Sequence, residues 1–210
     1  MVFILKISED DFESALDAAI AHLAGGGVLV YPTDTVYGMG CDASSRSALD
    51  SIRRIKKVEP AKPFSVMMAD QKMISEYCEV EPWARPILEK YLPGPYTFLL
   101  KDKGLCAAAG NGKLGVRIPD SGFCQALCSR FGRPIVTTSA NVSGKEPPKD
   151  FKDIEKKVLE AVGIAIDAGP TKYAGASTIV DLVDNRLIRE GGRGMEIGMD
   201  ALLAASASEG

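Results

Sequence analysis

VLVYPTDTVYGMG, residues 28–40, places a short apolar segment directly before a polar loop. Val28–Tyr31 is bounded by Gly25-Gly26-Gly27 on one side and by Pro32 on the other, which predicts a short buried strand. Ligands in open α/β sheets collect beyond the ends of strands. The loop that begins at Pro32 is therefore a candidate site for chemistry.

Helical patterns flank this strand. Ser8–Asp11 resembles a capping box, and the apolar residues of Phe12–Leu23 recur at helical spacing, so a helix should end near the three glycines. Ala48–Ile55 predicts a second amphipathic helix with basic flanks. The remaining strands are predicted at Phe64–Met68, Tyr96–Leu100, Val116–Ile118, Pro134–Thr138, Ile164–Asp167, Thr178–Leu182 and Leu187–Arg189, and the remaining helices at Trp83–Tyr91, Phe123–Phe131 and Asp150–Val162.

The order of these elements indicates an α/β fold with one domain. Strands and helices alternate, but several strands follow one another without room for a crossover helix. We therefore expect a twisted open sheet of mixed parallel and antiparallel strands with flanking helices. The domain should span residues 1–200, and residues 201–210 should form a flexible tail because they offer little hydrophobic surface to pack.

The composition is that of an ordinary globular protein. Of the 210 residues, 46% are hydrophobic and 25% are charged, and no segment reads as a signal peptide or membrane span, which predicts a cytoplasmic protein. The net charge of −3 argues against non-specific coating of nucleic acid. Five cysteines without a CxxC pair, with a single histidine, do not form a zinc or iron ligand set and predict reduced, mostly buried thiols.

Three loops that follow apolar strands are rich in small hydroxyl and amide side chains. They are Pro32–Gly40, Thr137–Gly144 and Gly175–Thr178. Hydroxyls, amides and backbone N–H groups next to glycine can hold carboxylates and phosphates without burying a full positive charge. Together the loops predict an anion-binding pocket, although each loop taken singly is more often a turn or a helix cap.

Basic residues favour the same interpretation. Five of the ten residues from Arg53 to Lys62 are basic in a chain that is acidic overall, although such a cluster is usually a solvated helix face. Arg117 lies within an apolar strand, where an unpaired guanidinium would be costly to bury. Its anionic partner could be a structural carboxylate such as Asp120 or Asp181, or a ligand.

Several segments, in order along the chain, resemble the signature of a known family. They are YPTDTVYGMG (31–40), LPGPYTFLL (92–100), LGVRIPD (114–120), TTSANVSG (137–144), and STIVDL (177–182) with IREG (188–191). This set resembles the YrdC-type threonylcarbamoyl-AMP synthase family from about Ala19 to Gly192.

The resemblance implies a reaction in which threonine, bicarbonate and ATP give threonylcarbamoyl-AMP and pyrophosphate. The activated group would then pass to an adenosine beside a tRNA anticodon, so tRNA or double-stranded RNA and partner proteins of that pathway are further expected partners. Matched positions imply that threonine is bound by Thr35, Arg117, Thr137 and Ser177, and the nucleotide by Lys56, Lys62, Ser139, Asn141 and Arg189. ATP would bring Mg²⁺, and catalysis would need alignment and charge neutralisation but no protein nucleophile.

Two positions depart from the family pattern. A lysine-x-arginine pair appears here as Lys56-Lys57-Val58, and a histidine of the following strand is replaced by Met67. These departures resemble the YciO branch of the family. The alternative hypothesis is therefore a YciO-like protein that binds a nucleotide or double-stranded RNA without synthase activity. If the chain is a synthase, Arg54, Lys57 or Lys62 should supply the charge missing at Val58.

Overall fold

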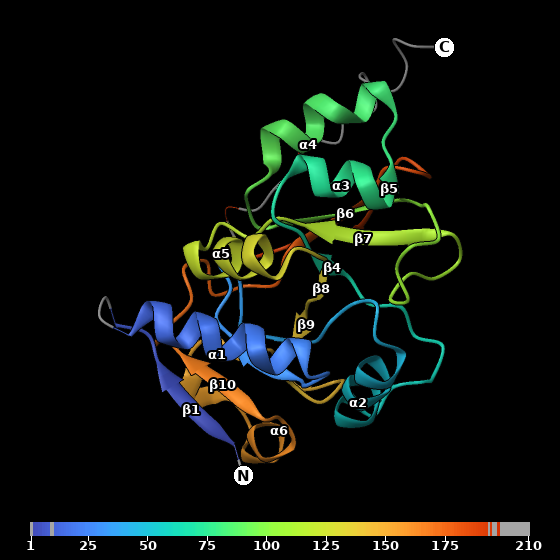
Figure 1. Ribbon diagram of the computed structural model, residues 1–210. Coiled ribbons are helices and arrows are strands. Elements are labelled where there is room, and N and C mark those ends of the chain that lie inside the picture. Colours follow the sequence, from blue (N-terminus) through green and yellow to red (C-terminus); the bar gives the residue numbers. More distant parts are fainter. Residues whose placement is uncertain (1, 9–10, 193, 195–196, 198–210) are drawn as a thin grey trace.

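A computed structural model describes residues 2–8, 11–192, 194 and 197 (Figure 1). The tail predicted at residues 201–210 lies outside them. The elements in chain order are β1 (Phe3–Lys6), α1 (Phe12–Ala24), β2 (Leu29–Tyr31), β3 (Gly38–Gly40), α2 (Arg46–Lys56), β4 (Val66–Met67), α3 (Gln71–Tyr77), β5 (Cys78–Glu79), the 3₁₀ helix η1 (Pro82–Ala84), α4 (Arg85–Tyr91), β6 (Tyr96–Asp102), β7 (Lys113–Arg117), α5 (Gly122–Phe131), β8 (Ile135–Val136), β9 (Thr138–Ser139), the 3₁₀ helix η2 (Phe151–Asp153), α6 (Lys156–Ala161), β10 (Ile164–Asp167), β11 (Thr178–Asp181) and β12 (Arg186–Arg189).

The strands form two mixed sheets. The first has the order β1-β10-β2-β3-β9, with β1, β10 and β2 parallel and the rest antiparallel. The second has the order β12-β11-β6-β7-β4-β8, with β5 paired to β6. The predicted α/β class with mixed strands is thus confirmed, but the strands are divided between two sheets where the sequence predicted one.

The segment predicted as one strand at Pro134–Thr138 joins the two sheets. Its first part, β8, pairs with β4 in the second sheet, and its continuation, β9, pairs with β3 in the first. Thr137 lies between them, and its N–H donates to Ser65 O at 2.8 Å. Gly40 permits this crossing, because a Cβ at that position would lie 2.2 Å from Val136 O. The polar residues at this junction therefore lie between the sheets.

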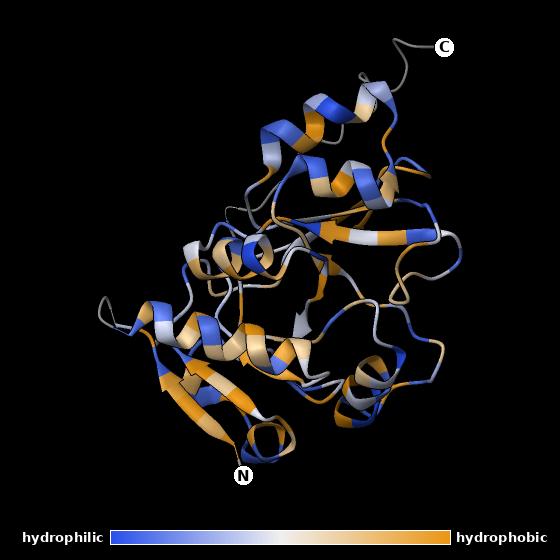
Figure 2. Cartoon of the chain, in the orientation of Figure 1, coloured by the Kyte–Doolittle hydropathy of each residue, from blue (hydrophilic) through white to orange (hydrophobic). Residues whose placement is uncertain are grey.

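Two hydrophobic cores support the sheets. Helices α1 and α5 cover the first sheet, and Leu16, Leu23, Leu127 and Ile166 are fully buried there. Figure 2 shows apolar residues along β1 and β10 and a mixed apolar and polar pattern along α1. A larger core lies between the sheets and helices α2, α3 and α4. Each fully buried leucine contributes about 1.5–3 kcal/mol by leaving water, so the two cores hold the junction in place.

Several local predictions differ from the structure. The predicted helix Asp150–Val162 is divided into η2 and α6, because Ile154 and Glu155 have extended backbone angles. Strand β4 covers only the middle of the predicted Phe64–Met68. Helix α3 and strands β1, β3 and β5 had not been predicted from the sequence, since each is short and lacks a clear hydrophobic period.

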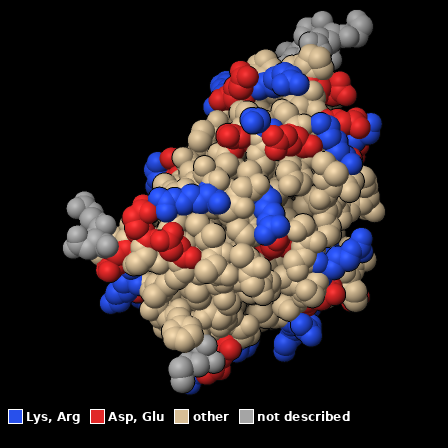
Figure 3. Space-filling model, in the orientation of Figure 1, with Lys and Arg blue, Asp and Glu red and all other residues tan. Residues whose placement is uncertain are grey.

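The cysteines are buried and unpaired, as predicted. Burial raises the pKa of the Cys41, Cys78 and Cys124 thiols to about 12 and that of Cys106 to about 11, and it raises the pKa of Cys128 well above its ordinary value. Among the helices that the structure describes, none combines the length and apolar character needed to cross a bilayer. Figure 3 shows basic and acidic side chains interspersed on one face of the molecule.

Candidate functional site

One pocket brings together every residue that the sequence singled out as a ligand-binding candidate. It has a volume of about 370 Å³ and lies where the two sheets meet. Its lining includes Thr35, Lys56, Lys62, Arg117, Thr137, Ser139, Asn141, Ser177 and Arg189. Among the residues that the structure describes, no Asp or Glu lines this pocket. Its character is thus cationic and rich in neutral hydrogen-bonding groups.

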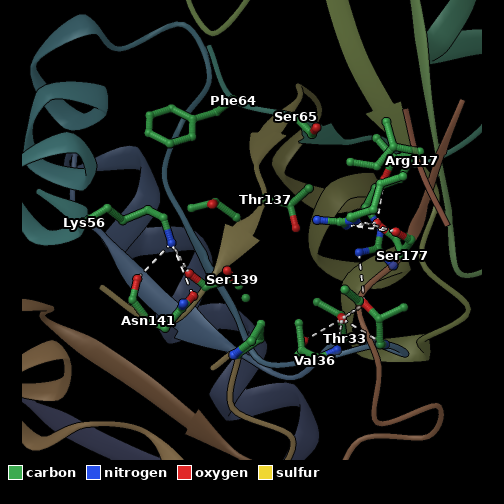
Figure 4. A pocket seen from close by; sticks show the side chains of 18 of the residues that line it. Thr33, Val36, Lys56, Phe64, Ser65, Arg117, Thr137, Ser139, Asn141 and Ser177 are labelled. Carbon is green, nitrogen blue, oxygen red and sulfur yellow. Dashed lines mark hydrogen bonds between the residues drawn. The ribbon is translucent and has the colours of Figure 1, made fainter. Parts of the chain in front are cut away.

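The pocket has two ends, which different elements build. Arg117 at the end of β7 and Ser177 just before β11 form one end. Lys56 at the end of α2 and Asn141 after β9 form the other. Figure 4 shows Thr137 between the two groups. We call these the arginine end and the lysine end.

The arginine end contains a buried ion pair that corrects one prediction. Arg117 Nη2 donates to Asp34 Oδ1 at 2.5 Å, and Arg117 Nη1 donates to Thr35 Oγ1 at 3.1 Å. The carboxylate partner is therefore Asp34, and neither Asp120 nor Asp181, both of which pair with lysines. Asp34 is far from Arg117 in sequence, but the fold places the loop after β2 beside the end of β7.

A second guanidinium approaches the same end. Arg189 Nη2 donates to Ser177 O at 2.8 Å and to Ser177 Oγ at 3.2 Å. Ser177 Oγ lies 3.1 Å from Thr97 Oγ1. Burial, and then the charge of Arg117, lower the pKa of Arg189. Arg117 is buried and Arg189 is more exposed. Two guanidiniums that repel each other form a site for an anion, because a negative group between them removes the repulsion.

The lysine end holds one cation in a fixed place. Lys56 Nζ donates to Ser139 O at 2.6 Å and to Asn141 O at 2.9 Å, so it ties α2 to the loop after β9. Asn141 Nδ2 donates in turn to Val142 O at 3.1 Å and fixes that loop. Burial, and then the charge of Lys62, lower the pKa of Lys56 to about 8. A phosphate at this end would meet one ordered ammonium group and nearby neutral donors.

Only part of the basic cluster at residues 53–62 reaches the pocket. Lys56 and Lys62 line it, whereas Arg54 and Lys57 do not. Val58 packs against the larger core, so its side chain serves packing. Of the three residues considered as replacements for the missing charge, Lys62 is the one on the pocket wall. The interpretation of the cluster as a solvated helix face holds for Arg54 and Lys57, which are exposed.

Arg53 holds the segment that carries Lys62. Its Nη2 donates to Lys62 O at 3.3 Å, and its guanidinium lies 5.7 Å from the centre of the Phe64 ring. Phe64 itself lines the pocket. The basic cluster therefore contributes to the site indirectly as well as directly.

Some pocket residues were not predicted. Thr33 lines the pocket. Its Oγ1 donates to Val36 O at 2.7 Å and lies 3.0 Å from Thr35 Oγ1, so Thr33 also fixes the conformation of its own loop. Ser65 and Thr97 also line the pocket, from segments predicted as buried strands. Alternation of side chains along those strands was the signal that could have identified them. Met67, in contrast, is fully buried in the core under α1 and α5, away from the pocket.

Comparisons with known proteins identify the relatives of this chain. The family model of Sua5, YciO and YrdC, described as telomere recombination, matches residues 21–191. A threonylcarbamoyl-AMP synthase of Chromohalobacter salexigens is 34% identical to this chain and covers 81% of it, and the alignment spans 94% of that protein.

Two solved structures are similar over most of the chain. Pyrococcus abyssi Sua5, complexed with L-threonine, has a TM-score of 0.83 at 25% identity and covers 91% of this chain. This chain spans 57% of that protein's length. Escherichia coli YciO also has a TM-score of 0.83, at 26% identity, and covers 95% of this chain, with 99% of its own length matched.

Proposed function

Because the chain belongs to the Sua5/YciO/YrdC family, we propose that it is an L-threonylcarbamoyl-AMP synthase that uses L-threonine, bicarbonate and ATP. The observation that carries the proposal is the two-ended pocket, with paired guanidiniums at one end and a buried ammonium at the other. A relative that is 34% identical carries this name, and a structurally similar Sua5 has been solved with L-threonine.

The arginine end suits an amino acid. The threonine carboxylate would accept hydrogen bonds from Arg117, whose planar guanidinium matches a carboxylate. Its amine and hydroxyl would contact Thr35, Thr137 and Ser177, which are neutral and line the same end. Neutral partners suit a reacting amine, because a nearby carboxylate would hold it as an unreactive ammonium.

The lysine end suits the nucleotide. Lys56, Lys62, Ser139 and Asn141 would bind the phosphates, and Arg189 would reach them from the opposite end. ATP would enter as its magnesium complex, with the metal held by phosphate oxygens and not by carboxylates of the pocket. The described carboxylates lie outside this pocket, and nowhere in the described residues do three or more His, Cys, Asp or Glu side chains gather as a metal site.

The reaction follows from this arrangement. The threonine amine adds to bicarbonate and, with loss of water, gives a carbamate. A carbamate oxygen then attacks the α-phosphorus of ATP, and the bond to the β-phosphate oxygen breaks to release pyrophosphate. The pocket would act by aligning the two substrates and neutralising the triphosphate. Transfer of the activated group to a tRNA adenosine, in the cytoplasm and with partner proteins, would complete the pathway.

Pyrophosphate release tests the proposal. Purified protein supplied with ATP and bicarbonate should release pyrophosphate with L-threonine and far less with L-serine, which lacks the methyl group. No release would overturn the proposal and favour a YciO-like binding protein, for which RNA affinity should fall linearly with the logarithm of salt concentration. Val58→Arg, which restores the family arginine, is the matched variant. If this variant releases pyrophosphate and the wild type does not, the missing synthase activity of the wild type is due to position 58.

A further inference from the structure

Asp34 lies behind the pocket wall. Its neighbours Thr33 and Thr35 line the pocket, whereas Asp34 does not, and its side chain is fully buried. Its Oδ1 accepts from Arg117 Nη2, and its Oδ2 accepts from the Asp120 N–H at 3.1 Å. Both carboxylate oxygens therefore accept hydrogen bonds from the protein itself, and the Asp34 side chain is not positioned to contact a ligand in the pocket.

Asp34 connects three separate parts of the chain. Through Arg117 it holds the end of β7, and through the Asp120 N–H it holds the turn before α5. Its own carbonyl accepts from the Tyr173 N–H at 2.8 Å, in the loop between β10 and β11. The carboxylate is thus fixed in position from several sides, and it can fix the guanidinium in turn.

Arg117 keeps unused hydrogen-bond donors. A guanidinium has five N–H groups, and those that pair with Asp34 and Thr35 are on the terminal nitrogens. Its Nε–H is buried and has no partner within the described part of the chain. A buried donor that is also positively charged and unpaired implies an absent acceptor. The presence of Arg189 on the lining at the same end favours an anionic acceptor.

We propose that Asp34 is a positioning residue that fixes the Arg117 guanidinium with its free N–H donors toward the pocket, so that they bind the carboxylate of an amino-acid substrate. Asp34 sets the orientation of Arg117 and offsets part of its charge, while the free donors recognise the ligand. The identification of that carboxylate as threonine's rests on the proposed function. The orientation of Arg117 by Asp34 does not.

Steady-state kinetics of pyrophosphate release test the positioning role. Asp34→Asn keeps the size of the side chain and an acceptor oxygen but removes the charge. It should raise the KM for threonine about tenfold to a hundredfold, the range for a weakened hydrogen bond between charged groups. The KM for ATP should change less than about twofold, because the nucleotide contacts lie at the lysine end. Equal rises in both values would overturn the proposal and indicate a general loss of structure.

Two further variants separate charge from folding. Asp34→Glu keeps the charge and should retain a threonine KM closer to that of the wild type than Asp34→Asn does. Asp120→Asn is the matched control, because its exposed side chain pairs with Lys172 while its backbone N–H still reaches Asp34. It should leave both KM values unchanged. A Glu variant no better than the Asn variant would contradict a role for the charge.

NMR of the ligand-free protein gives a test that does not depend on activity. The Arg117 Nε–H signal, assigned as the one lost in Arg117→Lys, should exchange slowly with water in the wild type. It should exchange faster and broaden in Asp34→Asn. An unchanged signal would overturn the proposal whether or not the protein makes pyrophosphate. Failure of threonine-dependent release in the wild type, with the NMR result as expected, would refute the proposed function alone.

Discussion

Arg117 is the residue whose replacement should separate the two ligands. Arg117→Ala should weaken threonine binding about tenfold to a hundredfold, because a charge-assisted contact to the carboxylate is lost. ATP binding should weaken much less. Calorimetric titration with each ligand separately measures both effects. Arg117→Lys keeps the charge without the planar geometry and should fall between the wild type and the alanine variant; equal losses for the two ligands would mean that Arg117 serves the nucleotide.

Lys56 should make nucleotide binding depend on pH. Its folded pKa of about 8 lies below the ordinary value of 10.5, so its charge is lost as the pH rises through 8. ATP affinity should then fall, to about a tenth of its pH 7 value at pH 9. Titration calorimetry across pH 6.5–9.5 tests this. Lys62→Met should move the fall to higher pH, because the charge of Lys62 lowers the pKa of Lys56. A flat profile in both proteins would contradict the assignment.

Lys56 should also make the free energy of unfolding depend on pH, and this dependence should be opposite in sign to that of ATP affinity. Between about pH 8 and 10.5 the unfolded chain binds a proton at Lys56 that the folded chain does not. The contribution of Lys56 to the free energy of unfolding therefore increases with pH across this interval. Affinity and stability thus change in opposite directions at one side chain, which makes the pair of measurements a sharp test of its burial.

The chemistry of the residues predicted which side chains line the pocket, but it did not predict which of them pair with one another. Thr35, Ser139 and Asn141 stood in polar loops after apolar strands, and the pocket contains all of them. The partner of Arg117 could not be predicted, because a buried ion pair between Asp34 and Arg117 depends on which loops lie next to each other in the folded protein. The spacing of residues along the chain does not indicate which loops these are.

At the scale of elements, the end of α2 offers a stability test. Lys57 caps this helix in the left-handed region, with φ 54° and ψ 49°, where a side chain is strained. Lys57→Gly should raise the free energy of unfolding by about 0.5–1 kcal/mol, measured by urea denaturation. Arg54→Gly, in the last turn of the same helix but at a helical position, is the control and should lower it by up to about 1 kcal/mol. Destabilisation by both would mean that the cap is not strained.

Elements with a clear hydrophobic period were predictable. Helices α1, α2 and α5 and strand β10 agree with the sequence to within a few residues. Short elements were not, and β3, Gly38-Met39-Gly40, shows why: its glycines have no strand propensity, and its place in the sheet is decided by close packing against Tyr31 and Val136. The division of Pro134–Thr138 into two strands has the same cause, since partners in two sheets decide it.

At the scale of the whole molecule, the pocket lies between both sheets, so ligands should stabilise the entire fold. A ligand present at a hundred times its Kd raises the free energy of unfolding by about 2.7 kcal/mol. For a chain of this size that corresponds to a rise in Tm of roughly 5–10 °C. Threonine with ATP should produce this rise in a thermal-shift assay and threonine with GTP a smaller one. No shift at saturating concentrations would contradict a binding pocket between the sheets.

The burial of the five thiols has a practical consequence for spectroscopy. Because every native cysteine is enclosed and reluctant to ionise, maleimide and nitroxide reagents should leave all of them intact in the folded protein. A single cysteine introduced on the pocket rim, for example by Lys62→Cys, would then be the one site of attachment, and no native cysteine would have to be replaced first. Fluorophores or spin probes could thereby follow substrate entry directly.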